Sequence, residues 1–109
     1  MLCGFNVRLP AVHSYGRLCT LFYDADKPVA PQAEVAWYAQ RLPKDEGSLL
    51  ELMCGSGRLL VPLVADGYKL HGVDLSAAML ASCEARLAAQ ELKAPLFRQD
   101  LVQLNLPFR

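Results

Sequence analysis

The chain has 109 residues, which is enough for one domain and too few for two. Hydrophobic residues make up 53% and charged residues 20%, so the composition excludes a disordered chain. Eleven Lys and Arg residues balance eleven Asp and Glu residues, and this formal net charge of +0 excludes the basic excess of a nucleic-acid-binding module or a polybasic membrane anchor. The longest apolar stretch, Leu59 to Ala65, is too short to span a membrane. Because the N-terminus has no signal-peptide pattern, we expect a cytoplasmic protein.

The first part of the chain contains one predicted helix. Residues 1–30 carry Pro and Gly at intervals and are predicted to be irregular. Residues 32–42 are predicted to be helical, because apolar side chains from Val35 to Leu42 recur at roughly helical spacing and Pro43 ends the pattern.

From Ser48 onward, short apolar runs alternate with helical patterns. The predicted elements are a strand at Leu49–Met53, a helix at 56–65, a strand at 69–73, a helix at 77–92 and a strand at 95–98. This order predicts a parallel α/β layout with right-handed crossovers. Pro62 falls inside the first of these helices, where it costs about 3 kcal/mol, so we expect a kink or packing that overrides the penalty.

Ser76 is the predicted N-cap of the helix at 77–92. Its expected buried stripe repeats every fourth residue and consists of Leu75, Met79, Cys83 and Leu87. Glu84, Arg86 and Gln90 lie off this stripe and are expected to be solvated.

The four cysteines form no Cys-x-x-Cys pair, and the two histidines are isolated from them. A metal site therefore has little support, and we expect four reduced thiols that are mostly buried as small hydrophobic groups.

Three polar features are predicted at the carboxyl edge of the sheet, where ligands bind in open parallel sheets. Gly55 and Gly57 follow the first strand and permit a tight turn with close backbone approach to a ligand. Asp74 ends the second strand and can accept hydrogen bonds from ribose hydroxyls, and Asp100 follows the third strand. A Gly-x-Gly alone is also compatible with an ordinary tight turn, but the three features together predict a nucleoside-binding crevice.

The loop sequence favours a nucleoside ligand that is poor in phosphate. A dinucleotide site requires a small residue where this chain has Leu60, which argues against a nicotinamide-dependent oxidoreductase. There is no phosphate-binding Gly-x-x-x-x-Gly-Lys-Ser/Thr loop, and Lys69 starts a strand at the wrong edge.

The stretch from Leu49 to about Leu106 resembles the first half of a class I S-adenosylmethionine-dependent methyltransferase. The resemblance is carried by three segments, LLELMCGSGR at 49–58, GVDLSAAML at 72–80 and FRQDL at 97–101. It implies a Rossmann-like parallel three-layer sandwich that is incomplete, with about three strands, flanking helices and a preceding helical segment. Residues 1–47 would be a helical lead-in or lid, and residues 48–109 the first half of a cofactor-binding domain.

The resemblance implies a role for each matching position. The segment Glu51–Gly57 would wrap the methionine part of S-adenosyl-L-methionine, and Asp74 would hold the ribose hydroxyls. Met79 would flank the adenine, Asp100 would receive the adenine amino group, and Leu101 would offer its backbone N–H to the ring.

Tyr23 is assigned as a lid residue near the cofactor carboxylate. The complete implied set is Tyr23, Glu51, Met53, Cys54, Gly55, Gly57, Asp74, Leu75, Met79, Asp100 and Leu101. The alternatives are structural: Glu51 caps the turn, Met79 and Tyr23 only pack, and Cys54 is a small buried residue.

Two departures from the family pattern stand out. Met53 occupies the first Gly position of acidic-x-Gly-x-Gly-x-Gly, where a side chain would crowd the amino-acid end of the cofactor. The family fold also continues through about four more strands, so we interpret the chain as an N-terminal fragment that is inactive by itself. Its bare strand at Leu49–Leu52 is expected to mediate self-association.

The reaction implied by the resemblance is methyl transfer to an unidentified acceptor, for which a small molecule is favoured over nucleic acid by the neutral charge. The alternative is a non-catalytic methyltransferase-like binding or interaction domain, which Met53 favours. No residue is assigned as catalytic base, because the lone His13 is more often a surface or packing residue. No metal and no membrane partner are expected.

Overall fold

The computed structural model describes residues 16–45 and 47–107 and contains one parallel sheet. Its strands are β1 (Leu49–Leu52), β2 (Leu70–Asp74) and β3 (Leu96–Arg98), hydrogen-bonded in the order β1-β2-β3. The predicted strand–helix order and the parallel pairing are therefore confirmed, and each strand starts or ends within one residue of its prediction.

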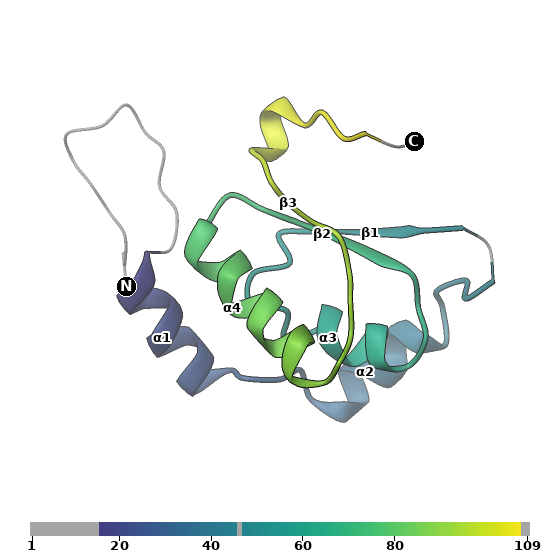
Figure 1. Cartoon of the computed structure of the whole chain (residues 1–109). Helices are drawn as coiled ribbons and strands as arrows, with labels where there is room; N and C mark the ends of the chain where they lie inside the picture. Colours follow the sequence, from purple (N-terminus) through teal and green to yellow (C-terminus); the bar gives the residue numbers. More distant parts are fainter. Residues whose placement is uncertain (1–15, 46, 108–109) are drawn as a thin grey trace.

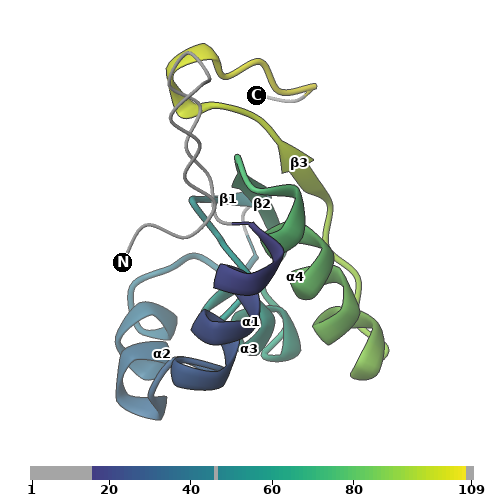
Figure 2. The ribbon, with the colours of Figure 1, turned by 90° about the vertical axis from the view of Figure 1, so that its left-hand side faces the viewer.

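Five helical elements accompany the sheet: α1 (Arg17–Asp26), α2 (Gln32–Ala39), α3 (Leu60–Ala65), α4 (Ala77–Ala89) and the single 3-10 turn η1 (Leu101–Gln103). Helix α3 connects β1 to β2, and α4 connects β2 to β3. In both views the four α-helices lie on the same side of the sheet (Figures 1 and 2). No helix of the described residues is long and apolar enough to cross a membrane.

Helix α1 corrects the prediction that residues 1–30 are irregular, as far as residues 16–30 are concerned. Its inner face packs on α4, where Asp24 accepts a hydrogen bond from Ser82 and forms an ion pair with Arg86 at 3.2 Å. Arg86 is consequently half-buried and not fully solvated as expected. The apolar side chains Leu18 and Phe22 point outward and are exposed. The sequence therefore lacks the buried apolar stripe from which this helix could have been predicted.

Helix α3 begins at Leu60 and not at Ser56, which resolves the difficulty posed by Pro62. Proline is tolerated in the first turn of a helix, where its missing N–H has no intrahelical partner. The carbonyl of Arg58, four residues before Pro62, instead accepts a hydrogen bond from the N–H of Ala30 at 2.8 Å. The start of α3 is thereby joined to the segment that links α1 to α2.

The N-cap prediction for α4 is confirmed, because the Ser76 hydroxyl accepts a hydrogen bond from the N–H of Met79 at 3.1 Å. Met79, Cys83 and Leu87 form the buried stripe as expected, whereas Leu75 precedes the helix and is only half-buried. The helix ends at Ala89, three residues earlier than predicted.

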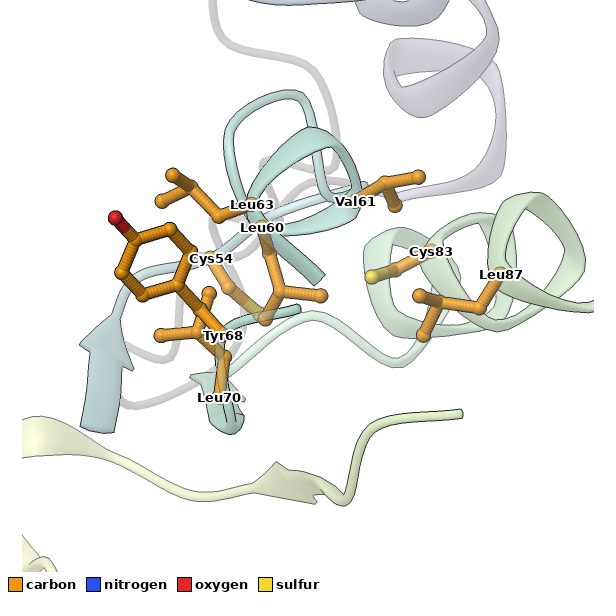
Figure 3. Close-up of a cluster of buried hydrophobic side chains, with 8 residues drawn as sticks. All are labelled: Cys54, Leu60, Val61, Leu63, Tyr68, Leu70, Cys83 and Leu87. Carbon is orange, nitrogen blue, oxygen red and sulfur yellow. The ribbon is translucent and has the colours of Figure 1, made fainter. Parts of the chain in front are cut away.

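The core lies between the sheet and helices α3 and α4 (Figure 3). Its buried residues are Cys54, Leu60, Val61, Leu63, Tyr68, Leu70, Cys83 and Leu87. The core includes one polar anchor, since the Tyr68 hydroxyl donates a hydrogen bond to the Ala39 carbonyl of α2 at 2.7 Å. This bond fixes α2 against the same side of the sheet.

Strand β1 is an edge strand in the described part of the chain, where it pairs only with β2. The expectation that this edge mediates self-association stays a prediction.

Gly57 packs against Cys83 and Val61 so closely that a methyl group would not fit. A Cβ atom built there would lie 2.7 Å from the Cys83 Sγ and 2.8 Å from the Val61 Cγ2, and the φ angle is +87°. We expect Gly57→Ala to lower the free energy of unfolding by about 2–4 kcal/mol, measured by urea denaturation, because overpacking adds to left-handed strain. The control is Gly47→Ala, with φ +70° but open space around it, which should cost only about 1 kcal/mol. Equal losses in the two variants would contradict the packing argument.

Candidate functional site

The loop between β1 and α3 turns through three left-handed residues. Met53 and Gly55 both have a φ angle of +57°, and Gly57 has +87°. Glycine adopts this conformation freely, whereas a side chain there costs about 1–2 kcal/mol. Met53 therefore carries strain at a position where glycine would carry none, and its side chain is exposed.

Asp74 fastens this loop to the end of β2. One carboxylate oxygen accepts a hydrogen bond from the N–H of Gly55 at 2.9 Å, and the other accepts one from the N–H of Ser76 at 2.9 Å. A third link, between the N–H of Cys54 and the Val73 carbonyl at 3.0 Å, continues the strand pairing into the loop. The Gly-rich turn and the start of α4 thus share one carboxylate.

Glu51 places a second carboxylate under the same loop. Its Oε2 atom is buried and has no hydrogen-bond partner within the described residues. Burial raises the pKa of Glu51 to about 7, although the nearby Arg58 guanidinium acts in the opposite direction. The buried hydroxyl of Ser56 also lacks a partner in the part of the chain that the structure describes.

The sequence did not predict the ion pair between Arg58, which directly follows the loop, and Glu34. Arg58 donates two hydrogen bonds to Glu34 of α2, at 2.8 and 3.2 Å, and this hydrogen bonding lowers the pKa of Glu34. The Tyr23 side chain of α1 and the Glu51 side chain both act electrostatically on Arg58 and raise its pKa, after the larger effect of the hydrogen bond with Glu34. The only sequence signal was an arginine directly after the second glycine of the turn.

The sulfur atoms near the loop are mostly enclosed. Met79 is buried, and its Sδ lies 3.9 Å from where a Cβ of Gly55 would be. The hydrogen bond with the Cys83 thiol, together with burial, raises the pKa of Cys54 well above its usual range, so Cys54 is a packed thiol and not a nucleophile. The expectation of four reduced cysteines is wrong for Cys19, which is disulfide-bonded, while Cys54 and Cys83 are free. His13 lies outside the described residues.

The residues after β3 join the site through the backbone. The N–H of Gln99 donates to the Asp74 carbonyl at 3.1 Å, which brings the chain after β3 alongside the end of β2. Asp100 is exposed and caps η1 by accepting from the N–H of Val102 at 2.9 Å. Leu101 starts η1, and the Leu75 carbonyl accepts from the Arg98 side chain at 3.0 Å.

The predicted residues therefore gather at the carboxyl edge of the sheet. The loop residues Glu51–Gly57 meet Asp74 and Met79 there, and Asp100 and Leu101 follow the neighbouring strand end. In chemical terms the edge offers the Asp74 carboxylate held by two N–H groups, and the Glu51 Oε2 and Ser56 hydroxyl atoms, which are buried without a partner among the described residues. A ligand with both an ammonium group and vicinal hydroxyls fits this donor and acceptor set. Among the described residues, no three His, Cys, Asp or Glu side chains lie close enough to hold a metal ion.

A family model described as a methyltransferase domain matches residues 49–109, which is more than half of the chain. The chain belongs to the methyltransferase-domain family. This confirms the resemblance inferred from the glycine-rich loop and the two aspartates.

Curated methyltransferases are similar to the chain over part of their length. A protein from Geobacillus sp. (strain WCH70) that is named as a methyltransferase is 33% identical over 89 residues, which is 77% of this chain and 36% of that protein. The ribosomal RNA small subunit methyltransferase C of Shewanella denitrificans is 41% identical over 61 residues, 54% of this chain and 18% of that protein. The chain thus spans between 18% and 36% of the length of these relatives.

Solved methyltransferases share the fold. An S-adenosylmethionine-dependent methyltransferase from Clostridium acetobutylicum superposes with a TM-score of 0.64 at 25% identity, over 83% of this chain and 38% of that chain. A glycopeptide N-methyltransferase complexed with S-adenosyl-L-methionine gives a TM-score of 0.61 at 28% identity, over 72% of this chain and 36% of that chain. The predicted Rossmann-like methyltransferase fold, incomplete at three parallel strands, is confirmed.

The buried carboxyl of Glu51 makes the free energy of unfolding depend on pH. Its pKa is about 7 in the folded chain against an ordinary 4.5, so the folded state holds the proton more tightly and stability falls as the pH rises through this window. We expect Glu51→Gln to be more stable than the unchanged chain by about 3 kcal/mol at pH 8 and by less than about 1 kcal/mol at pH 5.

Urea denaturation at the two pH values measures this difference. The exposed Glu84→Gln is the control and should leave the pH dependence unchanged. A stability gain for Glu51→Gln that is the same at both pH values would show that burial of the charge is not its cause.

Proposed function

We propose that the carboxyl edge of the sheet binds S-adenosyl-L-methionine and that the protein containing this chain is a methyltransferase. The observation that carries the proposal is the grouping at one edge of Asp74, the left-handed glycine loop and the Glu51 carboxyl, whose Oε2 atom is buried without a partner among the described residues. Family membership and the cofactor bound to a similar solved methyltransferase support it.

The chain's own residues divide the binding between them. The Glu51 carboxylate would accept hydrogen bonds from the ammonium group of the methionine part, and Gly55 and Gly57 would let the backbone approach it. The Asp74 carboxylate would accept hydrogen bonds from the ribose hydroxyls, for which it must give up part of its hold on Gly55 and Ser76. Asp100 and Leu101 would face the adenine, with Met79 packed beneath the loop.

The cofactor supplies a sulfonium-bound methyl group that is already electrophilic. The protein's contribution is then to bind the cofactor in one orientation and to align an acceptor with the methyl–sulfur bond. We propose a small-molecule acceptor, because the chain has no excess of basic residues. The match to a ribosomal RNA methyltransferase covers 61 residues and only 18% of that protein, so it does not favour an RNA acceptor.

Residues 1–47 are proposed as a lead-in that covers the cofactor's amino-acid end, and residues 48–109 as the cofactor-binding unit. Support comes from the Glu34–Arg58 ion pair and from the proximity of Tyr23 to Arg58. Through the ion pair, α2 is attached to the residue that follows the loop and not only to the core.

Titration calorimetry with S-adenosylhomocysteine tests the cofactor assignment, with NAD as the ligand control. We expect binding of S-adenosylhomocysteine and none of NAD. Asp74→Asn should weaken binding about 10- to 100-fold, because charged hydrogen bonds are lost, each contributing about 1.5–3 kcal/mol. The exposed Asp66→Asn is the matched control, and a thermal melt verifies that both variants fold. If neither this chain nor a longer chain that contains it binds S-adenosylhomocysteine, the non-catalytic interaction domain becomes the better hypothesis.

Met53 is expected to weaken cofactor binding through its side chain. We expect Met53→Gly to bind S-adenosylhomocysteine about fivefold more tightly, equivalent to about 1 kcal/mol, and to unfold at higher urea concentration because the left-handed strain is relieved. Met53→Ala separates the two effects, since it removes the bulk but keeps the strain. Unchanged affinity in both variants would exclude crowding by this side chain.

A further inference from the structure

The accessible sulfur of this site belongs to Met53. Its side chain is 72% exposed, whereas Met79 is 4% exposed, Cys54 6% and Cys83 0%. Cys19 is already disulfide-bonded. In the described part of the chain, a soluble oxidant that reaches the loop therefore meets one exposed thioether, that of Met53. Met53 lies within the proposed cofactor-binding loop.

The neighbouring thiols do not compete for such an oxidant. A cysteine reacts with peroxides as the thiolate, and the hydrogen bond with Cys83, together with burial, raises the pKa of Cys54 and holds it as a thiol. The same hydrogen bond lowers the pKa of Cys83, but Cys83 is 0% exposed and a soluble oxidant does not reach it. A thioether needs no deprotonation, so Met53 remains reactive at any physiological pH.

The backbone keeps Met53 in its exposed position. The N–H of Cys54 is bonded to the Val73 carbonyl at 3.0 Å, and the N–H of Gly55 is bonded to Asp74 at 2.9 Å. Because the residues directly after Met53 are fixed to β2, a local shift cannot withdraw its side chain into the core. Met53 has a left-handed φ angle of +57°, and its side chain is exposed and not packed on the core.

We propose that Met53 is a site of reversible oxidation by peroxides, placed to modulate ligand binding at the glycine loop. The thioether sulfur attacks one peroxide oxygen, an S–O bond forms as the O–O bond breaks, and the second oxygen leaves as water or an alcohol after taking up a proton. Sulfur loses two electrons and the peroxide gains them. The reverse step belongs to a thiol-dependent sulfoxide reductase, in which two thiols become a disulfide and the oxygen leaves as water.

The effect on binding rests on the proposed function. The sulfoxide adds an oxygen atom and a strong dipole to a side chain beside the position proposed for the cofactor's amino-acid end. The added oxygen would lie next to the loop that carries Glu51, where the zwitterionic amino-acid end of the cofactor would have to bind. We therefore expect the oxidised chain to bind S-adenosylhomocysteine at least threefold more weakly.

The first arm of the test does not depend on cofactor binding. The folded chain is treated with dilute hydrogen peroxide, and peptide mass spectrometry follows sulfoxide at Met53 and at Met79. We expect Met53 to be oxidised at least tenfold faster than Met79, and the two rates to converge in concentrated urea, where burial is lost. Equal rates in the folded chain, or faster oxidation of Met79, would overturn the proposal of a selective site.

The second arm measures S-adenosylhomocysteine affinity before oxidation, after oxidation and after treatment with a methionine sulfoxide reductase and dithiothreitol. The unchanged chain should lose affinity and regain it, while Met53→Leu, which keeps the bulk and lacks the sulfur, should be insensitive to peroxide. Unaltered affinity of an oxidised chain that bound before treatment would overturn the modulating role. Absence of binding before treatment would instead count against the cofactor proposal, and the oxidation site would be judged on the first arm alone.

Discussion

The two hydrogen bonds of the Asp74 carboxylate are the constraint on which the rest of this site depends. They join the N–H of Gly55, in the loop after β1, to the N–H of Ser76, at the start of α4, each at 2.9 Å. Hydrogen bonds to a charged acceptor contribute more than neutral ones, and both donors belong to backbone that a helix or strand leaves without a partner. One side chain therefore sets the spacing between the glycine loop and the helix that follows β2.

The glycine loop can adopt this position because the core beneath it is packed without spare volume. Gly57 is seated against Cys83 and Val61, and a side chain at Gly72 of β2 would meet Cys54 and Leu60 at less than 3 Å. The sulfur atoms of Cys54 and Cys83 thus act as packing groups that hold two backbone segments close together (Figure 3). This close approach leaves Met53 as the loop residue that projects outward, with backbone strain that a glycine would avoid.

Charge distribution connects the lead-in helices to the same loop. Arg58 is shared between Glu34 of α2, which it binds directly, and Glu51, whose charge it stabilises from a distance. Because Glu51 keeps a pKa near 7 despite this cation, burial is the stronger influence on that carboxyl. The position of α2 and the protonation of the site are consequently coupled through one arginine. The link from Asp24 of α1 to Arg86 of α4 provides a second attachment of the lead-in.

The sequence by itself determined the elements from Leu49 onward, the N-cap at Ser76 and the polar residues at the ends of the three strands. These features depend on apolar spacing and on turn chemistry within a few residues, so they can be recognised locally. Tertiary structure alone decided the rest. Helix α1 is held in place because Asp24 on its polar inner face contacts Ser82 and Arg86, which are 58 or more residues away in the sequence. Helix α3 begins at Leu60 because the Arg58 carbonyl, which Pro62 has no N–H to bond, accepts a hydrogen bond from the N–H of Ala30. The raised pKa of Glu51 and the Glu34–Arg58 ion pair likewise arise from burial and from contacts between distant segments, which no local pattern encodes.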